Sequence, residues 1–275
     1  MEETIIRSAD DVFAASDLPQ FSVSRLQRYL TCPESYRLHY LERLRPKLQS
    51  ANFVFGSALH VVLADYFRQG MNPQENFLHL WEGLKDIELH YGGKESWENL
   101  RTKGENLLSL FLAEEVQRIT KVYAVERSFA FRISNLPMPF EGIIDLVADV
   151  DGKKTVVDWK TSASRYARHE VILSDQLTAY FLDQPDAEQL AFCVFVKTKR
   201  PKIEWLFAKR DGADFAEFLQ KVAHVTSQIE EGNFYKRPGR HCGMCDFLPV
   251  CLRDKQAIEK TLIRVPTFSE KGDGR

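Results

Sequence analysis

The amino-acid sequence predicts a mixed α/β fold in which helices precede a central sheet. Apolar residues recur at helical spacing over most of the first 120 residues, whereas from residue 122 the chain alternates and is rich in Val, Phe and Tyr. An Asp-Gly pair at 151–152 separates two apolar runs, which is a strong signal for a β-hairpin. The chain has 275 residues, 44% of them hydrophobic and 28% charged, a composition typical of a globular enzyme with one sizeable core.

The first part of the chain is expected to be helical. Ser22 and Ser24 can each cap a first helix, which Pro33 then interrupts. Gly92 and Gly93 break the helical pattern between two later segments. The expected helical segments cover residues 22–41, 55–67, 73–91 and 96–120.

The middle of the chain is expected to form the sheet. Strands are indicated where β-branched and aromatic residues gather, and turns where Gly, Pro, Asn and Asp do, as at 135–139. Ser174 or Asp175 can cap a short helix, and a longer amphipathic helix closes the region. The expected strands cover 122–133, 140–150, 155–159, 190–196 and 203–207, and the two helices cover 174–182 and 213–231.

Charge and targeting signals set limits on the possible functions. The net charge of −2 neither requires nor excludes a nucleic-acid partner, because such binding depends on local basic groups. The chain contains no apolar run of about 18 residues and begins with a polar, acidic segment, so we expect neither a membrane span nor a secretory signal. The cytoplasm is the expected compartment. The sequence contains no Gly-x-x-x-x-Gly-Lys-(Ser/Thr) motif, so the chain is not expected to be a helicase.

Two acids and a lysine stand on the predicted hairpin. Asp145 lies on its first strand, and Asp158 and Lys160 lie on its second. Side chains at i and i+2 of a strand share a face, so Asp158 and Lys160 should point together and Trp159 the opposite way. Carboxylates hold Mg²⁺ or Mn²⁺, and a nearby ammonium can orient water or offset charge, which is the chemistry of phosphodiester hydrolysis.

Cysteines form a second candidate centre. Cys242, Cys245 and Cys251 lie close together near the C-terminus, and Cys32 lies near the N-terminus. In a reducing compartment such clustered thiols are metal ligands more often than disulfides. The spacing alone suits zinc and iron–sulfur equally. Cys193, in an apolar strand, is expected to be a small buried residue.

These motifs, taken in order, resemble the PD-(D/E)XK nuclease superfamily, specifically its RecB-like branch. That branch has a Gly-x-x-x-His helix, a Gly-x-x-Asp strand, an (Asp/Glu)-x-Lys strand and a Gln-x-x-x-Tyr helix. The matching segments here are Gly56–His60, Gly142–Asp145, Asp158–Lys160 and Gln176–Tyr180. The resemblance covers the chain from about Phe21 to Cys251.

The resemblance implies a role for each motif residue. Lys160 would assist the attacking water, and Gln176 and Tyr180 would contact the DNA strand or position the lysine. Glu126 matches an acid often seen on the preceding strand, although a structural role for it is equally open. The implied ligands of one or two divalent ions, Mg²⁺ or Mn²⁺, are His60, Asp145, Asp158 and the carbonyl of Trp159.

The cysteines resemble those of AddB-type nuclease subunits and CRISPR-associated RecB-like exonucleases, with one cysteine before the nuclease motifs and three after them. In those families the four ligate a [4Fe–4S] cluster. The resemblance therefore favours an iron–sulfur cluster over zinc, with four ligands: Cys32, Cys242, Cys245 and Cys251.

These features together predict a restriction-endonuclease-like mixed central sheet flanked by helices, with an N-terminal helical insertion and a C-terminal cysteine region. We expect one domain over residues 1–275, comprising a mainly helical part (21–120), a catalytic core (121–231) and a cysteine tail (232–255). The expected function is a metal-dependent DNA exonuclease acting on single-stranded ends, in DNA repair or CRISPR adaptation, beside a helicase or a CRISPR integrase. Endonuclease activity, a non-catalytic or partner-dependent DNA-binding subunit and a zinc-stabilised binding protein remain alternatives.

Overall fold

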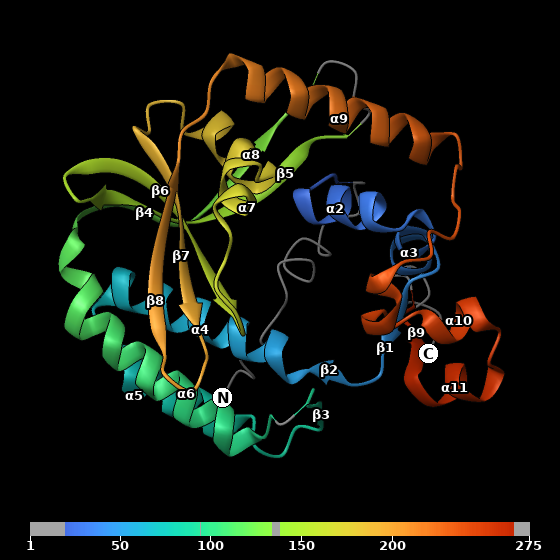
Figure 1. Cartoon of the computed structure of the whole chain (residues 1–275), viewed down its shortest axis with the longest axis horizontal. Helices are drawn as coiled ribbons and strands as arrows, with labels where there is room; N and C mark the ends of the chain where they lie inside the picture. Colours follow the sequence, from blue (N-terminus) through green and yellow to red (C-terminus); the bar gives the residue numbers. More distant parts are fainter. Residues whose placement is uncertain (1–19, 94, 134–137, 267–275) are drawn as a thin grey trace, which may run out of the picture. The chain divides into compact units, whose positions relative to one another are not determined.

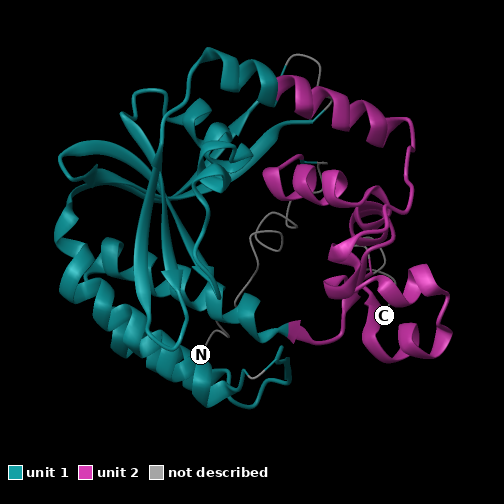
Figure 2. Ribbon diagram, in the orientation of Figure 1, with its two compact units in different colours: residues 1–20, 50–218 teal, residues 21–49, 219–275 magenta. Residues whose placement is uncertain are grey.

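The computed structural model describes residues 20–93, 95–133 and 138–266, which divide into two compact units (Figure 2). Unit 1 is built on residues 50–218. Unit 2 combines residues 21–49 with those from 219 onward. The first helices thus group with the residues of the cysteine tail rather than with the later helices.

A mixed sheet forms the centre of unit 1, as the sequence predicts (Figure 1). Its strands lie in chain order; β6 and β7 are parallel, and the other neighbours are antiparallel. The expected turn at 135–139 falls largely on residues 134–137, outside the described residues. The five strands are β4 (Ile119–Phe131), β5 (Phe140–Val150), β6 (Lys153–Ser162), β7 (Gln189–Val196) and β8 (Lys202–Ala208).

The predicted hairpin joins β5 and β6. Asp151 and Gly152 have φ values of 52° and 76°, and both lie in the left-handed region that a two-residue turn of the primed type requires. The ladder runs from Val150 opposite Lys153 to Leu146 opposite Val157. This short turn therefore fixes the register of the two strands.

Helices cover both faces of the sheet (Figure 1). One face packs on α4 (Ala51–Gln69), α5 (Pro73–Gly83) and α6 (Trp97–Leu110), in a core that includes Trp81, Phe111 and Trp159. The other face contacts α8 (Asp175–Asp183), which the short α7 (Arg168–Ile172) precedes. The helix expected over 96–120 ends earlier, and η2 (Phe111–Glu115) and η3 (Val116–Arg118) follow it before β4. The two-residue strands β2 (Gln49–Ser50) and β3 (Leu89–His90) lie before α4 and after α5 in the chain.

Unit 2 brings together segments from both ends of the chain. The β1 and β9 strands pair antiparallel, with Leu44 opposite Arg264. Tyr29, Tyr36 and Phe234 pack their rings together. Its elements are α2 (Val23–Thr31), α3 (Pro33–Tyr36), η1 (Arg37–Leu41), β1 (Leu44–Pro46), η4 (Arg240–Met244), α10 (Leu248–Leu252), α11 (Lys255–Thr261) and β9 (Leu262–Arg264), together with most of α9 (Gly212–Glu230).

Across the described helices, none combines the length and the apolar character that crossing a bilayer requires.

Gly104 of α6 tests the packing of the helical layer. A Cβ added there would overlap the ring of Phe77, which is fully buried. We expect Gly104→Ala to lower the free energy of unfolding by about 1–3 kcal/mol, more than the gain in helix propensity of about 1 kcal/mol. The matched Gly83→Ala places its methyl group in open space and should leave stability equal or higher. Chemical denaturation measures both, and equal stability of the two variants would contradict this packing.

Candidate active site

Asp145 and Asp158 stand opposite one another where β5 and β6 separate. The ladder between these strands ends at Leu146 and Val157, and the two aspartates occupy the next position. There the Asp145 carboxylate replaces a main-chain acceptor: the backbone N–H of Trp159 donates to its Oδ2 at 2.8 Å. The hairpin register thus brings two acids, 7% and 1% exposed, to one point of the sheet.

Glu126 on β4 adds a third carboxylate to this row. Its neighbours Val125 and Arg127 pair with β5, which sets Glu126 opposite Asp145. The backbone of Glu126 is left-handed, with φ of 50°, an uncommon conformation for a side chain of this size. Strain of this kind persists only where the surrounding structure holds it, and it concentrates at functional sites.

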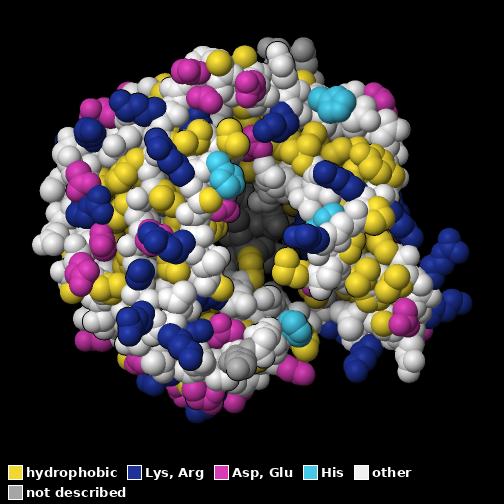
Figure 3. Space-filling model, in the orientation of Figure 1, with side chains coloured by type: hydrophobic (Ala, Val, Ile, Leu, Met, Phe, Trp, Pro, Cys, Tyr) yellow, Lys and Arg dark blue, Asp and Glu magenta, His cyan; other side chains and the backbone are white. Residues whose placement is uncertain are grey.

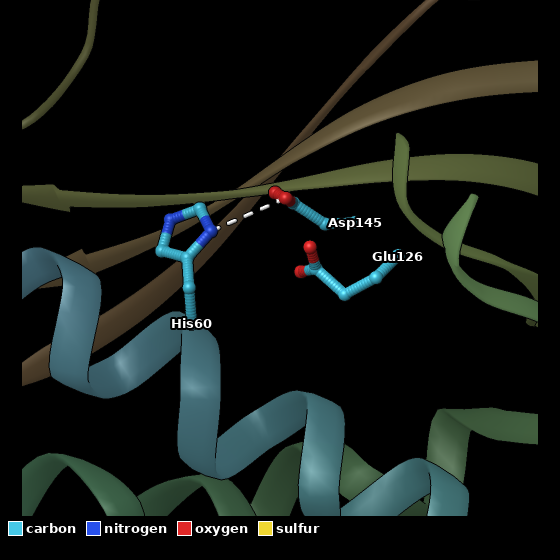
Figure 4. Close-up of side chains that lie close together, drawn as sticks. All are labelled: His60, Glu126 and Asp145. Carbon is cyan, nitrogen blue, oxygen red and sulfur yellow. Dashed lines mark hydrogen bonds and ion pairs between the residues drawn. The ribbon is translucent and has the colours of Figure 1, made fainter. Parts of the chain in front are cut away.

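His60 reaches the same point from α4. Gly56, one turn earlier, lets the helix approach β6 closely, since an added Cβ would lie 3.1 Å from the Thr161 hydroxyl. The Nδ1 atom of His60 lies 3.2 Å from Oδ1 of Asp145. In Figure 4 His60 rises from α4 toward Asp145, and Glu126 turns toward the same space. One donor atom from each of these residues lies within 4.8 Å of the other two.

The carboxylates of Glu126, Asp145 and Asp158 place excess negative charge at this site, which favours binding of a cation. Burial, reinforced by the charge of Asp145, raises the pKa of Glu126 to about 7. Burial also raises the pKa of Asp158, although Lys160 opposes the rise. For His60, burial is outweighed by Asp145 and Asp158, and its pKa rises to about 9. Glu126 and Asp158 are therefore harder to ionise here than in water, and added positive charge would favour their ionised forms.

A closed ring of polar contacts surrounds Lys160. Its Nζ lies 2.6 Å from Oδ2 of Asp158 and donates to Oε1 of Gln176 at 2.7 Å. Nε2 of Gln176 donates to the Tyr180 hydroxyl at 2.8 Å, which in turn donates to Oδ1 of Asp158 at 3.1 Å. The predicted i, i+2 and i, i+4 juxtapositions are thus present in the structure.

This ring is held in a buried setting. Burial opposes the charge of Lys160, but Asp158 outweighs it and raises the pKa of the amine. Burial and the charge of Asp158 raise the pKa of Tyr180 well above its ordinary value, so the hydroxyl stays protonated as a donor. Trp159 points the opposite way, into the core against Phe67 and Phe111.

Tyr166 is a neighbour of the site that no sequence pattern indicated. Its ring lies edge-on to Phe192, with centroids 6.0 Å apart, and Lys160 Nζ lies 5.1 Å from the Phe192 centroid. Burial raises the pKa of Tyr166, and its hydroxyl also senses the charges of Lys160 and Asp158. Because it follows β6 in an irregular segment, no periodicity could place it beside the lysine.

The four candidate cysteine ligands all lie in unit 2. Burial raises the pKa of Cys245 and of Cys251, and the nearby thiols add to both shifts: Cys32 and Cys242 act on Cys245, and Cys245 and Cys32 act on Cys251. Among the described residues, however, His60, Glu126 and Asp145 make up the sole group of three or more donors within 4.8 Å of one another. The described thiols therefore do not form a group of three or more donors of that kind.

Comparison with known protein families identifies this arrangement. A family model described as the PD-(D/E)XK nuclease superfamily matches residues 20–252, which include every candidate site residue named above. The chain belongs to this superfamily. It is therefore a nuclease, and the mixed sheet carrying Asp145, Asp158 and Lys160 is the superfamily's restriction-endonuclease-like fold.

Individual relatives are more distant. Human mitochondrial genome maintenance exonuclease 1 is 37% identical over 65 residues, which is 24% of this chain and 19% of the human protein. A solved structure from Eubacterium rectale, described as that of an exonuclease, aligns with 98% of this chain and 99% of its own chain. The TM-score is 0.56 and the sequence identity is 13%, so the likeness supports the fold. The structure of SSO0001, with 15% identity over 88% of this chain and 90% of its own, has a TM-score of 0.42, too low to support an argument.

The Tyr180 hydroxyl provides a direct test of the polar ring in this nuclease. Tyr180→Phe removes the group that joins Gln176 to Asp158. Hydrogen bonds to charged groups contribute about 1.5–3 kcal/mol, so the cleavage rate should fall about 10- to 100-fold. Single-turnover cleavage measures the change.

The matched control is Tyr123→Phe. The Tyr123 hydroxyl also donates to an aspartate, Asp149, but away from the site, so this variant should cleave at the wild-type rate. Equal rates for the two variants would show that the ring does not contribute to catalysis.

Proposed function

We propose that this nuclease hydrolyses DNA phosphodiester bonds with Mg²⁺ or Mn²⁺, as an exonuclease acting on single-stranded ends, and that a [4Fe–4S] cluster stabilises it. The observation that carries the proposal is the group of His60, Glu126 and Asp145 beside the Asp158–Lys160 pair. Oxygen-rich donor sets of this kind suit hard divalent ions.

The donor set fits a divalent ion. His60, Glu126 and Asp145 already present one donor atom each within mutual reach, and Asp158 and the Trp159 carbonyl remain the further ligands expected from the sequence. When bound, such an ion lowers the pKa of its water and offsets negative charge on the phosphate. Its positive charge would also offset the burial and the neighbouring carboxylate that raise the pKa of Glu126.

The residues of the polar ring then have distinct tasks. Lys160 can donate from Nζ to an attacking water or to a phosphate oxygen, and thus orient the one or offset charge on the other. Gln176 and Tyr180 limit the positions that its ammonium can occupy, because one accepts from Nζ and the other fixes the Asp158 carboxylate. Position rather than added acidity is their contribution.

The proposed substrate and the proposed protein partners rest on the comparison with the human relative and on the motifs of the sequence. The matched segment of the human relative belongs to an exonuclease named for genome maintenance, which favours DNA and cleavage from an end. Since the sequence contains no nucleotide-binding Gly-Lys motif, unwinding would come from a partner such as a helicase, and a CRISPR integrase is the alternative partner. The cytoplasm, as a reducing compartment, suits the free thiols.

We favour an iron–sulfur cluster over a single zinc ion at the cysteines, on the resemblance of their order in the chain. Tetrahedral zinc at about 2.3 Å from each sulfur would need sulfurs about 3.8 Å apart. The charges of neighbouring thiols contribute to the raised pKa values of Cys245 and Cys251, so the candidate ligands lie in one region of unit 2. A multi-iron cluster binds each cysteine to a different iron and therefore does not need the sulfurs to be as close as zinc does. Cys245 also packs against an apolar cluster around Leu38, Phe247 and Leu262.

Cleavage of end-labelled DNA tests the nuclease proposal. We expect laddering from one end of single-stranded DNA with Mg²⁺ or Mn²⁺ and none with chelator. Asp158→Asn and Lys160→Ala should each reduce the rate at least ~100-fold without loss of fold. Wild-type rates in the Lys160 variant would refute the role given to the ammonium, and no cleavage by cluster-loaded wild type would favour a partner-dependent binding subunit.

Glu126 offers a control within the same experiment. Glu126→Gln removes a charged ligand, so half-maximal cleavage should require more Mn²⁺. Glu141→Gln on β5, outside the row of acids, should leave the Mn²⁺ requirement unchanged. An unchanged requirement in both variants would remove Glu126 from the ligand set.

The cluster is tested by purification without air. We expect a brown protein containing iron and acid-labile sulfide in equal amounts, and Cys245→Ser should lose the colour and unfold at lower temperature, because a bound centre contributes folding energy. Cys193→Ala, which changes a buried thiol in the core of unit 1, should keep the colour. A colourless, zinc-loaded wild type would overturn the assignment.

A further inference from the structure

The two units carry opposite net charges. Residues 21–49 and 219–275 hold 16 Lys and Arg against 9 Asp and Glu, a net charge of +7, whereas the rest of the chain holds 21 against 30, a net charge of −9. In Figure 3 dark-blue Lys and Arg side chains project from the part of unit 2 that carries α10 and α11. A polyanion would thus be attracted to unit 2 and repelled by most of unit 1.

Within unit 2, two arginines share one aromatic ring. The Cζ atoms of Arg25 and Arg28 lie 4.5 Å and 5.8 Å from the ring centroid of Tyr40. Stacking holds both guanidinium groups in place while leaving their edges able to donate. The η1 segment that carries Tyr40 is a π-helical turn, a feature often found at functional sites.

Neither arginine is neutralised by the protein. Among the described residues, neither Arg25 nor Arg28 forms an ion pair, and the buried Nε of Arg28 has no hydrogen-bond partner. The carboxylates on this stretch of chain are already engaged: Glu34 pairs with Arg37, and Glu42 pairs with Arg37 and Arg264.

The environment of His39 is consistent with this excess of positive charge. It is 8% exposed, its Nε2 has no hydrogen-bond partner within the described part of the chain, and its ring packs edge-on against Tyr40. Burial, together with the positive charges of Arg28, Arg45 and Arg25, lowers its pKa to about 3. Two half-buried guanidinium groups with no carboxylate partner leave a local excess of positive charge, which an anionic ligand would offset.

We propose that Arg25 and Arg28, held on Tyr40, form a phosphate-binding subsite that grips the backbone of the nucleic-acid strand on unit 2. The inference rests on the proposed function, which supplies a phosphodiester chain as the anion at hand. Guanidinium groups bind phosphate oxygens through paired N–H donors, and such contacts add affinity without reading sequence. The site is separate from the acids of unit 1 and deepens the function by assigning a second role, substrate retention, to the cysteine-bearing unit.

Binding in the presence of chelator tests this subsite without cleavage. Fluorescence anisotropy of a labelled single-stranded oligonucleotide would be measured over a range of salt concentrations. The Arg25→Gln/Arg28→Gln variant should bind about tenfold or more weakly for every sequence, and the slope of log K against log salt should shrink by about 0.7 for each lost contact. With Mg²⁺, KM should rise while kcat stays unchanged.

The matched control removes the same charge elsewhere on unit 2. Lys255→Gln/Lys260→Gln changes two exposed lysines of α11. Its affinity should stay within about twofold of wild type. An equal loss in both variants would mean that general charge, not the arginine pair, binds the strand, and wild-type affinity in the arginine variant would also overturn the proposal.

Arginine footprinting of the wild type covers the case in which the variant does not fold. Bound DNA should protect Arg25 and Arg28 from phenylglyoxal while leaving exposed Arg253 reactive; equal reactivity with and without DNA would refute the subsite. The two proposals fail separately. Wild type that binds DNA but never cleaves it contradicts the nuclease function alone, whereas cleavage with unprotected Arg25 and Arg28 contradicts the subsite alone.

Discussion

The two-residue turn at Asp151 and Gly152 is the constraint on which the arrangement of the candidate active site depends. Its left-handed backbone sets the pairing of β5 with β6, and counting back along the ladder places Asp145 opposite Asp158. A slip of one residue would turn every side chain of β6 to the other face, sending Asp158 into the core and Trp159 toward Lys160's partners. The turn at Asp151 and Gly152 therefore sets the position of Asp145 relative to Asp158, although it lies several residues from both.

Electrostatic repulsion shapes the remainder of the site. Three carboxylates in a row across β4, β5 and β6 repel one another, and each is compensated differently: Glu126 by a raised pKa, Asp145 by His60 and a backbone N–H, and Asp158 by Lys160 and Tyr180. His60 and Tyr180 come from α4 and α8, which lie on opposite faces of the sheet, whereas Lys160 and the backbone N–H belong to β6. The helical layers thus supply part of the compensation without which the acids could not remain close.

Local sequence patterns predicted most strands and helices of unit 1 and several contacts of the site. Features that depend on residues far apart in the chain were not predicted. Alternation and helical spacing indicated the strands and helices of unit 1, and spacings of two and four residues placed Lys160 beside Asp158 and Tyr180 beside Gln176. The left-handed backbone of Glu126 depends on tertiary packing, so its sequence neighbours could not reveal that it joins the group. The three-residue pair of β1 and β9, more than 200 residues apart, is likewise too short and too distant to leave a periodic signal.

Unit 2 is built from two segments of the chain that are separated by the whole of residues 50–218, so its two parts are synthesised at different times. Its first part, residues 21–49, leaves the ribosome long before Cys242, Cys245 and Cys251, and the whole of the five-stranded sheet is made in between. Since domains fold as they emerge, the nuclease sheet can be complete while the early segment still lacks its partner. The acids of unit 1 can therefore be in place on a nascent chain before the basic unit assembles, and any centre bound by the four cysteines would form last.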